Sequence, residues 1–437
     1  MTAAAVSTRS TSIDAVTGLT VFLVVLIVIP SDLIFGPLGS AGTPAEVLGM
    51  GLFAVWLTAT VSNLGRRQRV AEPIRNFAWL FIGAVLVSYV AANSRAMFGA
   101  EARAADSGLL LVCSWLGVLL MTMDRVPTRE RLDVLLRRLV LLAGALATLG
   151  LLQFATKMPF TNYLQVPGLA TNQSLVSLYG RNGLTRPAGT AVHPIEFGAV
   201  LTMALPIALH YAMTDRHRPP LRRWYPVLAI GFAVPISISR SAVLSLIVVL
   251  CFVLPTWPRA ARRRAYAAIL GVFGAVYVMV PGLLGTITHL FTGVSNDSSA
   301  KSRSGSFSLA FDFISRTPIF GRGFLTFLPA YHILDDQYLG LLIETGVVGL
   351  AAYLGLLVSG VVGGLRLRHT ANRVDSLLGV SLAASAASAL ASFALFDAFS
   401  FPMAASLIFL ILGSIGALRR LARTPSADIR KETPSPA

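Results

Sequence analysis

Ionisable side chains gather in three short stretches of an otherwise apolar chain. The first stretch runs from Arg181 to Gly198 and also contains Arg186, His193 and Glu196. Because His193 and Glu196 are three residues apart, they share one face if a helix has begun there. We favour a role for them in binding or catalysis, since an ionisable group at the end of a membrane span is costly unless it is used. The alternative is that His193 is an interfacial cap and Glu196 a snorkelling carboxylate.

The second stretch contains a lone arginine, Arg240, between two apolar runs. Ser239 and Ser241 flank this arginine, and almost no loop surrounds it. A guanidinium group presents planar donors that can bind phosphate oxygens in a bidentate way, and serine hydroxyls can add further donors. The stretch therefore predicts a phosphate-binding arginine, with an ordinary interfacial arginine at a tight turn as the alternative.

The third stretch, residues 291–350, is a long polar loop followed by an apolar run. Connections between membrane helices are usually short, so a polar loop of this length indicates a function. Phe307, Phe311 and Ile314 recur at helical spacing, which predicts a short amphipathic helix that Pro318 ends.

Charged residues of this third stretch are candidates for binding and proton transfer. The candidate phosphate or sugar ligands are Arg303, Arg316 and Arg322. Asp335 and Asp336 are candidate bases, and Glu344 lies eight residues further on, inside an apolar run. A carboxylate there is expensive unless it pairs, for instance with an arginine. As alternatives, Arg316 is a solvated helix end, and the glycines after Glu344 allow close helix packing.

Composition places these stretches in a membrane protein. The chain has 437 residues, of which 55% are hydrophobic and 13% charged, whereas a soluble protein carries roughly 25% charged residues. The two cysteines, Cys113 and Cys251, lie inside apolar runs and are expected to be small buried side chains rather than a disulfide framework. The sequence contains no Walker A, dinucleotide-binding, HExxH or DxD motif and no Cys/His cluster. We therefore expect neither a metal nor another cofactor, and a donor that arrives already activated, such as a lipid diphosphate.

Twelve apolar runs are candidate membrane spans, each near the ~20 residues that a helix needs to cross the bilayer. They cover residues 15–36, 45–62, 74–92, 107–123, 139–155, 190–213, 224–238, 241–257, 266–290, 337–362, 376–396 and 398–418. The seventh run is short and contains two prolines, so it is the weakest candidate. Continuous apolar runs of this length exclude a closed β-barrel, whose strands alternate. The fold class is therefore an all-α polytopic membrane protein.

Lysine and arginine predict the orientation of these spans. With the N-terminus in the cytoplasm, 26 of the 36 cations lie in inner segments, as the positive-inside rule requires. This distribution explains the net charge of +16 through anionic headgroups and argues against nucleic acid as a partner. Both termini are then inside, as tails 1–14 and 424–437, the latter polar and expected to be disordered. Residues 15–423 form one transmembrane domain with outer loops at about 156–189 and 291–336.

Several motifs, in this order, resemble the O-antigen ligase and polymerase superfamily of bacterial membrane glycosyltransferases. The late motifs are PIFGRGF at 318–324, DDQYL at 335–339 and ETGVVG at 344–349. Upstream, residues 186–198 and the SRS run at 239–241 also resemble the family. The resemblance covers roughly residues 180–350 by motif and the whole chain by topology. It implies a GT-C-like fold in the bacterial inner membrane, with the large loop between spans nine and ten and the active site facing the periplasm or exterior.

The resemblance also implies a reaction. Family members transfer a glycan, without a metal and with inversion, from a polyprenyl-diphosphate-linked oligosaccharide to a sugar hydroxyl. The acceptor belongs to lipid A core in a ligase or to another lipid-linked glycan in a polymerase, and we favour the polymerase. Expected partners are this donor, the acceptor and membrane lipid, with a chain-length regulator or a flippase as candidate protein partners.

Carried to this sequence, the family's diphosphate-binding arginines correspond first to Arg186 and Arg240, with the loop arginines as helpers. The full set of candidate substrate-binding residues is Arg181, Arg186, Arg240, Arg303, Arg316, Arg322, Glu196 and Glu344. Many family members have His-Asn where this chain has Asp335 and Asp336, so the base stays open between Asp335 and His193.

Two other classes of function compete with this interpretation. Twelve spans with both ends inside also describe many secondary transporters, and a flippase for lipid-linked glycans belongs to the same class. Transporters usually show two related halves and binding residues near the midplane, whereas here the halves do not match and the ionisable groups cluster at one interface. A structural membrane scaffold is the third interpretation.

Overall fold

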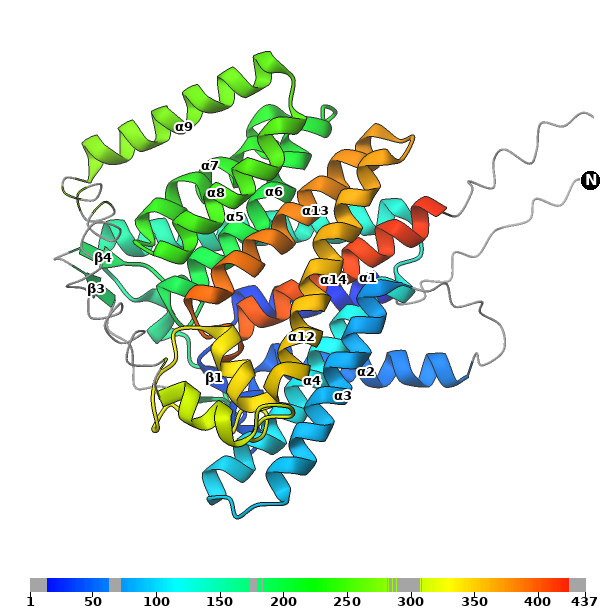
Figure 1. Ribbon diagram of the computed structural model, residues 1–437. Coiled ribbons are helices and arrows are strands. Elements are labelled where there is room, and N and C mark those ends of the chain that lie inside the picture. Colours follow the sequence, from blue (N-terminus) through cyan, green and yellow to red (C-terminus); the bar gives the residue numbers. More distant parts are fainter. Residues whose placement is uncertain are drawn as a thin grey trace, which may run out of the picture.

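The computed structural model describes residues 14–62, 72–172, 179–181, 184–280 and 309–423, together with residues 282, 285, 288 and 307. Most of these residues are helical (Figure 1). The long helices are α1 (Ala15–Val28), α2 (Pro44–Val61), α3 (Pro73–Asn93), α4 (Gly99–Arg125), α5 (Arg129–Thr156), α6 (Pro194–Thr214), α7 (Pro220–Ile236), α8 (Arg240–Val253), α9 (Arg259–Met279), α12 (Gln337–Arg366), α13 (Arg373–Ser392) and α14 (Pro402–Arg423). Each of the twelve apolar runs therefore overlaps one helix, although the first run (15–36) extends beyond α1 and most of the end of the ninth run (281–290) lies outside the described residues. The expected terminal tails, apart from Asp14, and Arg303 lie outside the described residues.

Length and composition allow eight of the helices in the described part to cross a membrane, namely α2, α3, α4, α5, α6, α12, α13 and α14. Helices α1 and α8 are apolar but shorter. The prediction of a multi-pass, all-helical membrane protein is confirmed, and the count of twelve spans stays a prediction. Helices α4, α6, α13 and α14 are the most buried of the eight and form the core, whereas α9 lies at the edge, with Val276 as its buried residue (Figure 1).

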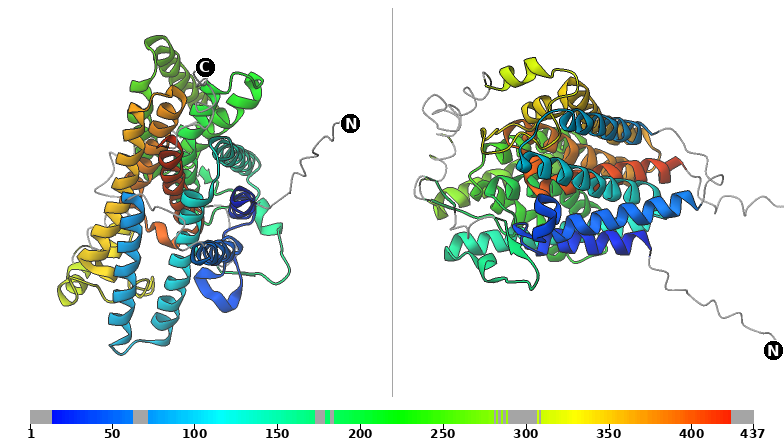
Figure 2. Two further views of the ribbon diagram at one scale, coloured as in Figure 1. Left: turned by 90° about the vertical axis from the view of Figure 1, so that its right-hand side faces the viewer. Right: turned by 90° about the horizontal axis from the view of Figure 1, so that it is seen from below.

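The helices are not all parallel, but their connections gather at two ends of the bundle (Figure 2). One end holds the described parts of residues 29–43, 94–98, 157–193, 237–239, 309–336 and 393–401, and we call it the loop end. The other end, where α1, α3 and α5 begin and α4, α6 and α14 finish, is called the arginine-rich end. The described parts of the predicted outer segments fall at the loop end. Which end faces the cytoplasm stays a prediction.

Short strands and 3-10 turns tie the connections of the loop end together. Strand β1 (Leu33–Ile34) pairs antiparallel with β2 (Ala170–Thr171), and β3 (Tyr179–Arg181) pairs antiparallel with β4 (Leu184–Arg186). The 3-10 turns of this end are η1 (Gly36–Gly42), η2 (Phe160–Tyr163), η5 (Phe393–Leu395) and η6 (Ala398–Ser400), whereas η3 (Leu254–Thr256) and η4 (Leu367–His369) follow α8 and α12 at the arginine-rich end. The β1–β2 pair joins the connection after α1 to the connection after α5.

The predicted amphipathic helix is present, but its buried face differs from the prediction. Residues 309–316 are helical, and Ala310 packs with Phe327 in a small apolar cluster. Phe307 and Phe311, which the spacing placed on the apolar face, are 48% and 65% exposed. The face formed by positions 310, 313 and 314 contacts the protein instead, because it has the same three-and-four spacing.

Candidate functional site

Hydrogen bonds at the loop end join segments that lie far apart in the sequence. Arg186 Nε donates to the Ser237 carbonyl at 3.0 Å, which links β4 to the turn between α7 and α8. The backbone N–H of Phe399 donates to Gln337 Oε1 at 2.7 Å and links the α13–α14 connection to the start of α12. The fold therefore brings most of the predicted site residues to one end of the bundle.

His193 and Glu196 cap the start of α6 together. His193 Nδ1 accepts the Ile195 N–H at 3.1 Å, and Glu196 Oε2 accepts the Val192 N–H at 2.8 Å. The arrangement resembles a capping box, but the donors are the N–H groups of Ile195 and Val192, each one residue before the donors of the standard motif. Glu196 Oε1 also accepts the Met403 N–H at 2.7 Å, so the same fully buried carboxylate caps α14. His193 is therefore the cap that the alternative describes, whereas Glu196 is fully buried and does not snorkel.

The capping bond also fixes how His193 can act. Because Nδ1 accepts a hydrogen bond, the neutral ring carries its hydrogen on Nε2 and presents a donor there. Burial, assisted by the positive charge of Arg186, lowers the pKa of His193 from its usual 6.5 to about 3. The ring also lies beside Phe401, with 6.1 Å between ring centroids. His193 is therefore neutral at pH 7 and suited to donating a hydrogen bond.

Backbone strain marks the turn that carries Arg240. Ile238 has a φ of 47° and is fully buried. The left-handed region is unfavourable for a β-branched side chain, at a cost of roughly 1–3 kcal/mol, and such strain clusters at functional sites. Arg240 follows as the first residue of α8 and is half-buried. The Ser239 and Ser241 hydroxyls hydrogen-bond each other at 2.8 Å. The turn thus holds Arg240 next to the segment that Arg186 binds.

The two aspartates at the start of α12 have different surroundings. Asp336 is the N-cap of α12, and its carboxylate accepts the N–H groups of Tyr338 and Leu339 at 2.9 and 3.2 Å. Asp335 is half-buried, and its negative charge acts on Asp397 in the connection between α13 and α14. Asp336 therefore caps α12, and the Asp335 carboxylate takes no part in this cap.

Asp397 is a residue that the sequence interpretation missed. Burial, with a smaller contribution from Asp335, raises its pKa from the usual 3.8 to about 6, and its side chain accepts a hydrogen bond from Ser400. A charge in the short gap between two apolar runs singled out Arg240, and the same signal could have found Asp397. The loop end thus holds two neighbouring carboxylates, Asp335 and Asp397.

Glu344 lies at a break in α12 that the glycine motif makes. Gly346 has a φ of 66° and interrupts the helix, and the turn at residues 318–323 packs against this break. Arg322 and Gly323 donate their N–H groups to the carbonyls of Ile343 and Glu344, both at 3.0 Å. A Cβ on Gly346 would lie 2.2 Å from the Ile319 carbonyl oxygen, so only glycine fits there. The backbones of the PIFGRGF and ETGVVG motifs therefore pack directly against each other.

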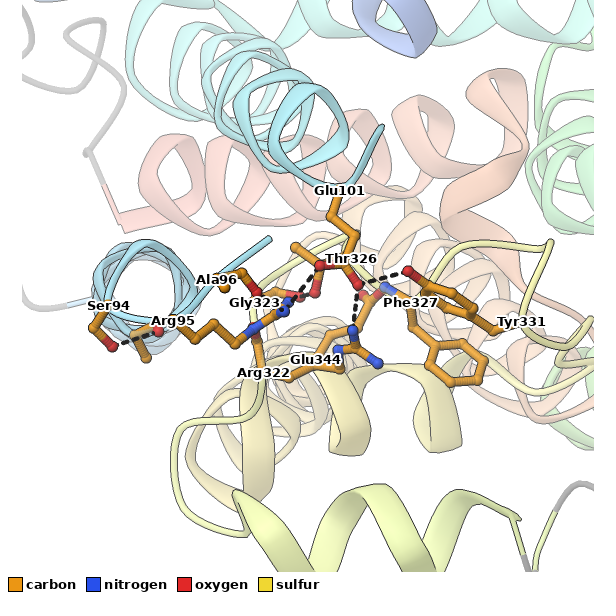
Figure 3. Close-up of polar contacts among 11 residues, drawn as sticks. Ser94, Arg95, Ala96, Glu101, Arg322, Gly323, Thr326, Phe327, Tyr331 and Glu344 are labelled. Atoms are coloured by element: carbon orange, nitrogen blue, oxygen red, sulfur yellow. Dashed lines mark hydrogen bonds and ion pairs between the residues drawn. The ribbon is translucent and has the colours of Figure 1, made fainter. Parts of the chain in front are cut away.

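The loop arginines lie in different environments. Arg322 forms an ion pair with Glu101 of α4 (Figure 3), and its guanidinium lies over the ring of Tyr331. Arg316 is exposed at the end of the 309–316 helix, 6.0 Å from the centre of the Phe313 ring. Arg181 lies in β3. Within the described ranges, His, Cys, Asp and Glu do not form a group of three or more that could hold a metal.

Comparison with known proteins adds one finding. A protein-family model described as O-antigen ligase matches residues 225–354. The matched part runs from α7 into α12 and includes Arg240, Asp335, Asp336 and Glu344, whereas Arg186 and His193 precede it. A search of curated proteins finds no match. The family match supports the assignment of this chain to the O-antigen ligase superfamily.

Proposed function

We propose that this chain is an inverting glycosyltransferase that moves a glycan from a polyprenyl-diphosphate-linked oligosaccharide to a sugar hydroxyl. The family match supports a membrane glycosyl-transfer role in polysaccharide assembly and implies lipid-linked oligosaccharide and glycan substrates. The observation that carries the proposal is that this match includes Arg240 and Asp335, which the fold places at the same end of the bundle as Arg186 and His193.

Arg186 and Arg240 are the proposed ligands of the donor diphosphate. Arg186 is anchored through Nε to the carbonyl of Ser237, and Arg240 begins the next helix three residues later. A guanidinium group binds phosphate oxygens with fixed geometry, and its charge stabilises the diphosphate as it leaves. Because the leaving group is already an anion held by these cations, the proposed reaction needs no metal.

Asp335 is the proposed base, and His193 is a hydrogen-bond donor to substrate. The acceptor oxygen attacks the anomeric carbon as the bond from that carbon to the diphosphate oxygen breaks, and the acceptor proton passes to the Asp335 carboxylate. Attack opposite the leaving group inverts the anomeric centre. His193 fits the donor role because its Nδ1 is occupied by the Ile195 N–H and its Nε2 carries the hydrogen.

The proposed site faces the periplasm or exterior of a bacterial inner membrane, and the proposed product is a polymer of lipid-linked repeats. The orientation rests on the distribution of arginine, most of which lies at the other end of the bundle. The preference for polymerisation over ligation rests on the acceptor, because a ligase is needed only where an outer membrane carries lipid A.

The test is transfer by the purified protein in liposomes with a lipid-linked oligosaccharide donor and EDTA present. Growth of long chains on the lipid carrier supports polymerisation, and transfer to added lipid A core supports ligation. Movement of the lipid-linked glycan across the bilayer without any new glycosidic bond would contradict the proposal and support a flippase.

A further inference from the structure

Glu101, in the first turn of α4, is a buried carboxylate with three polar partners from two parts of the chain. Its side chain is 1% exposed and forms ion pairs with Arg95 and Arg322. The hydroxyl of Tyr331 donates to the same carboxylate at 2.8 Å. Figure 3 shows these groups converging on Glu101 from opposite sides. One carboxylate therefore joins the α3–α4 hairpin to the loop that precedes α12.

The hairpin also holds the backbone of this loop. Arg95 donates from Nε to the Arg322 carbonyl at 3.2 Å and from Nη1 to Glu101 at 2.8 Å. The Arg322 guanidinium lies over the Phe313 and Tyr331 rings, with centroid distances of 5.0 and 5.3 Å. A cation in such a position is stabilised by the faces of both rings. Three kinds of contact thus fix Arg322: the hydrogen bond from Arg95 to its carbonyl, the ion pair of its guanidinium with Glu101, and the two aromatic rings.

The Glu101 cluster, defined as Glu101, Arg95, Arg322 and Tyr331, is connected to the proposed site through α12. The N–H groups of Arg322 and Gly323 bond to the carbonyls of Ile343 and Glu344 at the break in α12. The Phe327 N–H donates to Glu344 Oε1 at 3.3 Å. Along the chain, Asp335 lies between Phe327 and the first turn of α12. A shift of the loop at Arg322 would therefore move the segment that carries Asp335.

An aromatic contact extends this connection to Asp397. Phe324, one residue after Gly323, is buried against Trp115 and Phe399, with centroid distances of 6.4 and 5.9 Å. Phe399 is two residues from Asp397, and its N–H donates to Gln337. The loop thus contacts both segments that bring carboxylates to the loop end.

We propose that Glu101 is a positioning residue that fixes the 318–336 loop, and with it Asp335, through its ion pairs with Arg322 and Arg95. This inference rests on the proposed function, and it assigns a role to a residue outside the part of the chain that the family model matches. Removing one partner of a buried ion pair leaves an uncompensated charge, so neutralising Glu101 strains the cluster much more than losing one hydrogen bond. Misplacement of a reacting group by about 1 Å can slow a reaction on the order of a hundredfold.

The experiment compares Glu101→Gln with Asp106→Asn in the full-length protein in liposomes. Asp106 is on the same helix, exposed, and accepts a hydrogen bond from Tyr89 at 2.8 Å, so its variant controls for an equal loss of charge on α4. We expect Glu101→Gln to lower the maximal transfer rate on the order of tenfold to a hundredfold with the donor KM nearly unchanged. Asp106→Asn should transfer like the wild type.

Hydrogen exchange provides a readout that does not depend on transfer. The N–H groups of Arg322, Gly323 and Phe327 should exchange faster in Glu101→Gln than in the wild type or in Asp106→Asn, while those of α14 stay unchanged. Tyr331→Phe, which removes one hydrogen bond but no charge, should show a smaller change of the same kind.

Two results would overturn the inference. Unchanged exchange at the loop in Glu101→Gln would show that Glu101 does not hold it. Faster exchange with wild-type transfer would show that the held position does not matter for the reaction. If the wild type forms no glycosidic bond with any lipid-linked donor, the proposed function fails, and the exchange data still decide whether Glu101 fixes the loop.

Discussion

The two ends of the helix bundle use charge in different ways. At the arginine-rich end, arginines pair with aspartates or glutamates from other helices or connections. These pairs are Arg75–Asp124, Arg129–Asp375, Arg131–Asp14, Arg137–Asp215 and Arg419–Glu72. Each pair joins two segments of the chain, so charge at this end serves mainly the packing of the helices.

At the loop end, several carboxylates are bound by backbone N–H groups instead. Glu196 caps α6 and α14, Asp336 caps α12, and Glu344 binds the N–H of Phe327. The Nε of Arg186 donates to the Ser237 carbonyl. Glu101, at the same end, forms ion pairs with Arg95 and Arg322.

This difference separates two roles of carboxylates in the fold. A carboxylate that accepts backbone N–H groups caps a helix or fixes a connection, and Arg186 and Arg240 at the same end are the proposed ligands of an anionic donor. Where arginines and carboxylates pair, the charges offset each other and lock helices together. The predictions below test this contrast, from the largest expected effect on transfer to the smallest.

Asp335→Asn should have the largest effect, with a loss of transfer on the order of a hundredfold to ten-thousandfold, as expected for a general base. Donor binding, measured by retention of a labelled lipid-linked oligosaccharide, should stay close to that of the wild type. Asp336→Asn is the matched control, because asparagine also accepts hydrogen bonds at an N-cap. Equal losses in the two variants would contradict the assignment of the base to Asp335.

Arg240→Lys should lower transfer on the order of a hundredfold, because lysine keeps the charge but loses the planar donors that fit two phosphate oxygens. The control variant is Arg131→Lys at the arginine-rich end, where the Arg131 guanidinium forms an ion pair with Asp14 at 2.6 Å. That variant should transfer at the wild-type rate per folded molecule. Rates are measured at saturating donor, with donor affinity determined separately. A fully active Arg240→Lys variant would remove Arg240 from the site.

The sequence predicted the helices well because continuous apolar runs of about 20 residues have few alternatives in a membrane. It placed the start of the fourth span at 107, whereas α4 begins at Gly99. Residues 100–105 are rich in alanine and are strong helix formers, although they carry charge. Glu101 was therefore assigned to a loop and missed, and its partner Arg322 lies 221 residues away in the sequence.

The candidate site residues share one end of the bundle, and their roles in transfer stay predictions. Arg186, His193, Arg240 and Asp335 do come to one end, because the alternation of spans dictates which connections share a side of the membrane. The double capping by Glu196 could not be predicted, because the N–H groups of Met403 and Ala404 come from the far end of the chain. Hydrophobic spacing likewise could not decide which face of the 309–316 helix meets the protein.

His193 should make the protein less stable in acid. Its pKa is about 3 in the folded protein and near 6.5 in the unfolded chain, so the unfolded chain binds more protons between these values and stability falls as pH drops below 6.5. His193→Ala should cost about 1 kcal/mol at pH 7.5 through loss of the cap. At pH 5 the wild type should lose on the order of 1–2 kcal/mol of stability that His193→Ala does not lose, so the variant becomes as stable as the wild type or more stable. Melting in detergent at both pH values measures this, and a difference that grows in acid would contradict the neutral assignment.

Asp215→Asn should have the smallest effect on transfer and a clear effect on stability. The Asp215 carboxylate ends α6 and binds Arg137 of α5 through two hydrogen bonds of 2.7 and 2.8 Å. Hydrogen bonds to charged groups contribute about 1.5–3 kcal/mol, and the substitution leaves the partly buried Arg137 without its counter-charge. We therefore expect a loss of roughly 2 kcal/mol, measured as a lower melting temperature, with the transfer rate per folded molecule unchanged. If Asp215→Asn instead slowed transfer as much as Arg240→Lys, charge at the arginine-rich end would also act on the reaction, and the contrast between the two ends would fail.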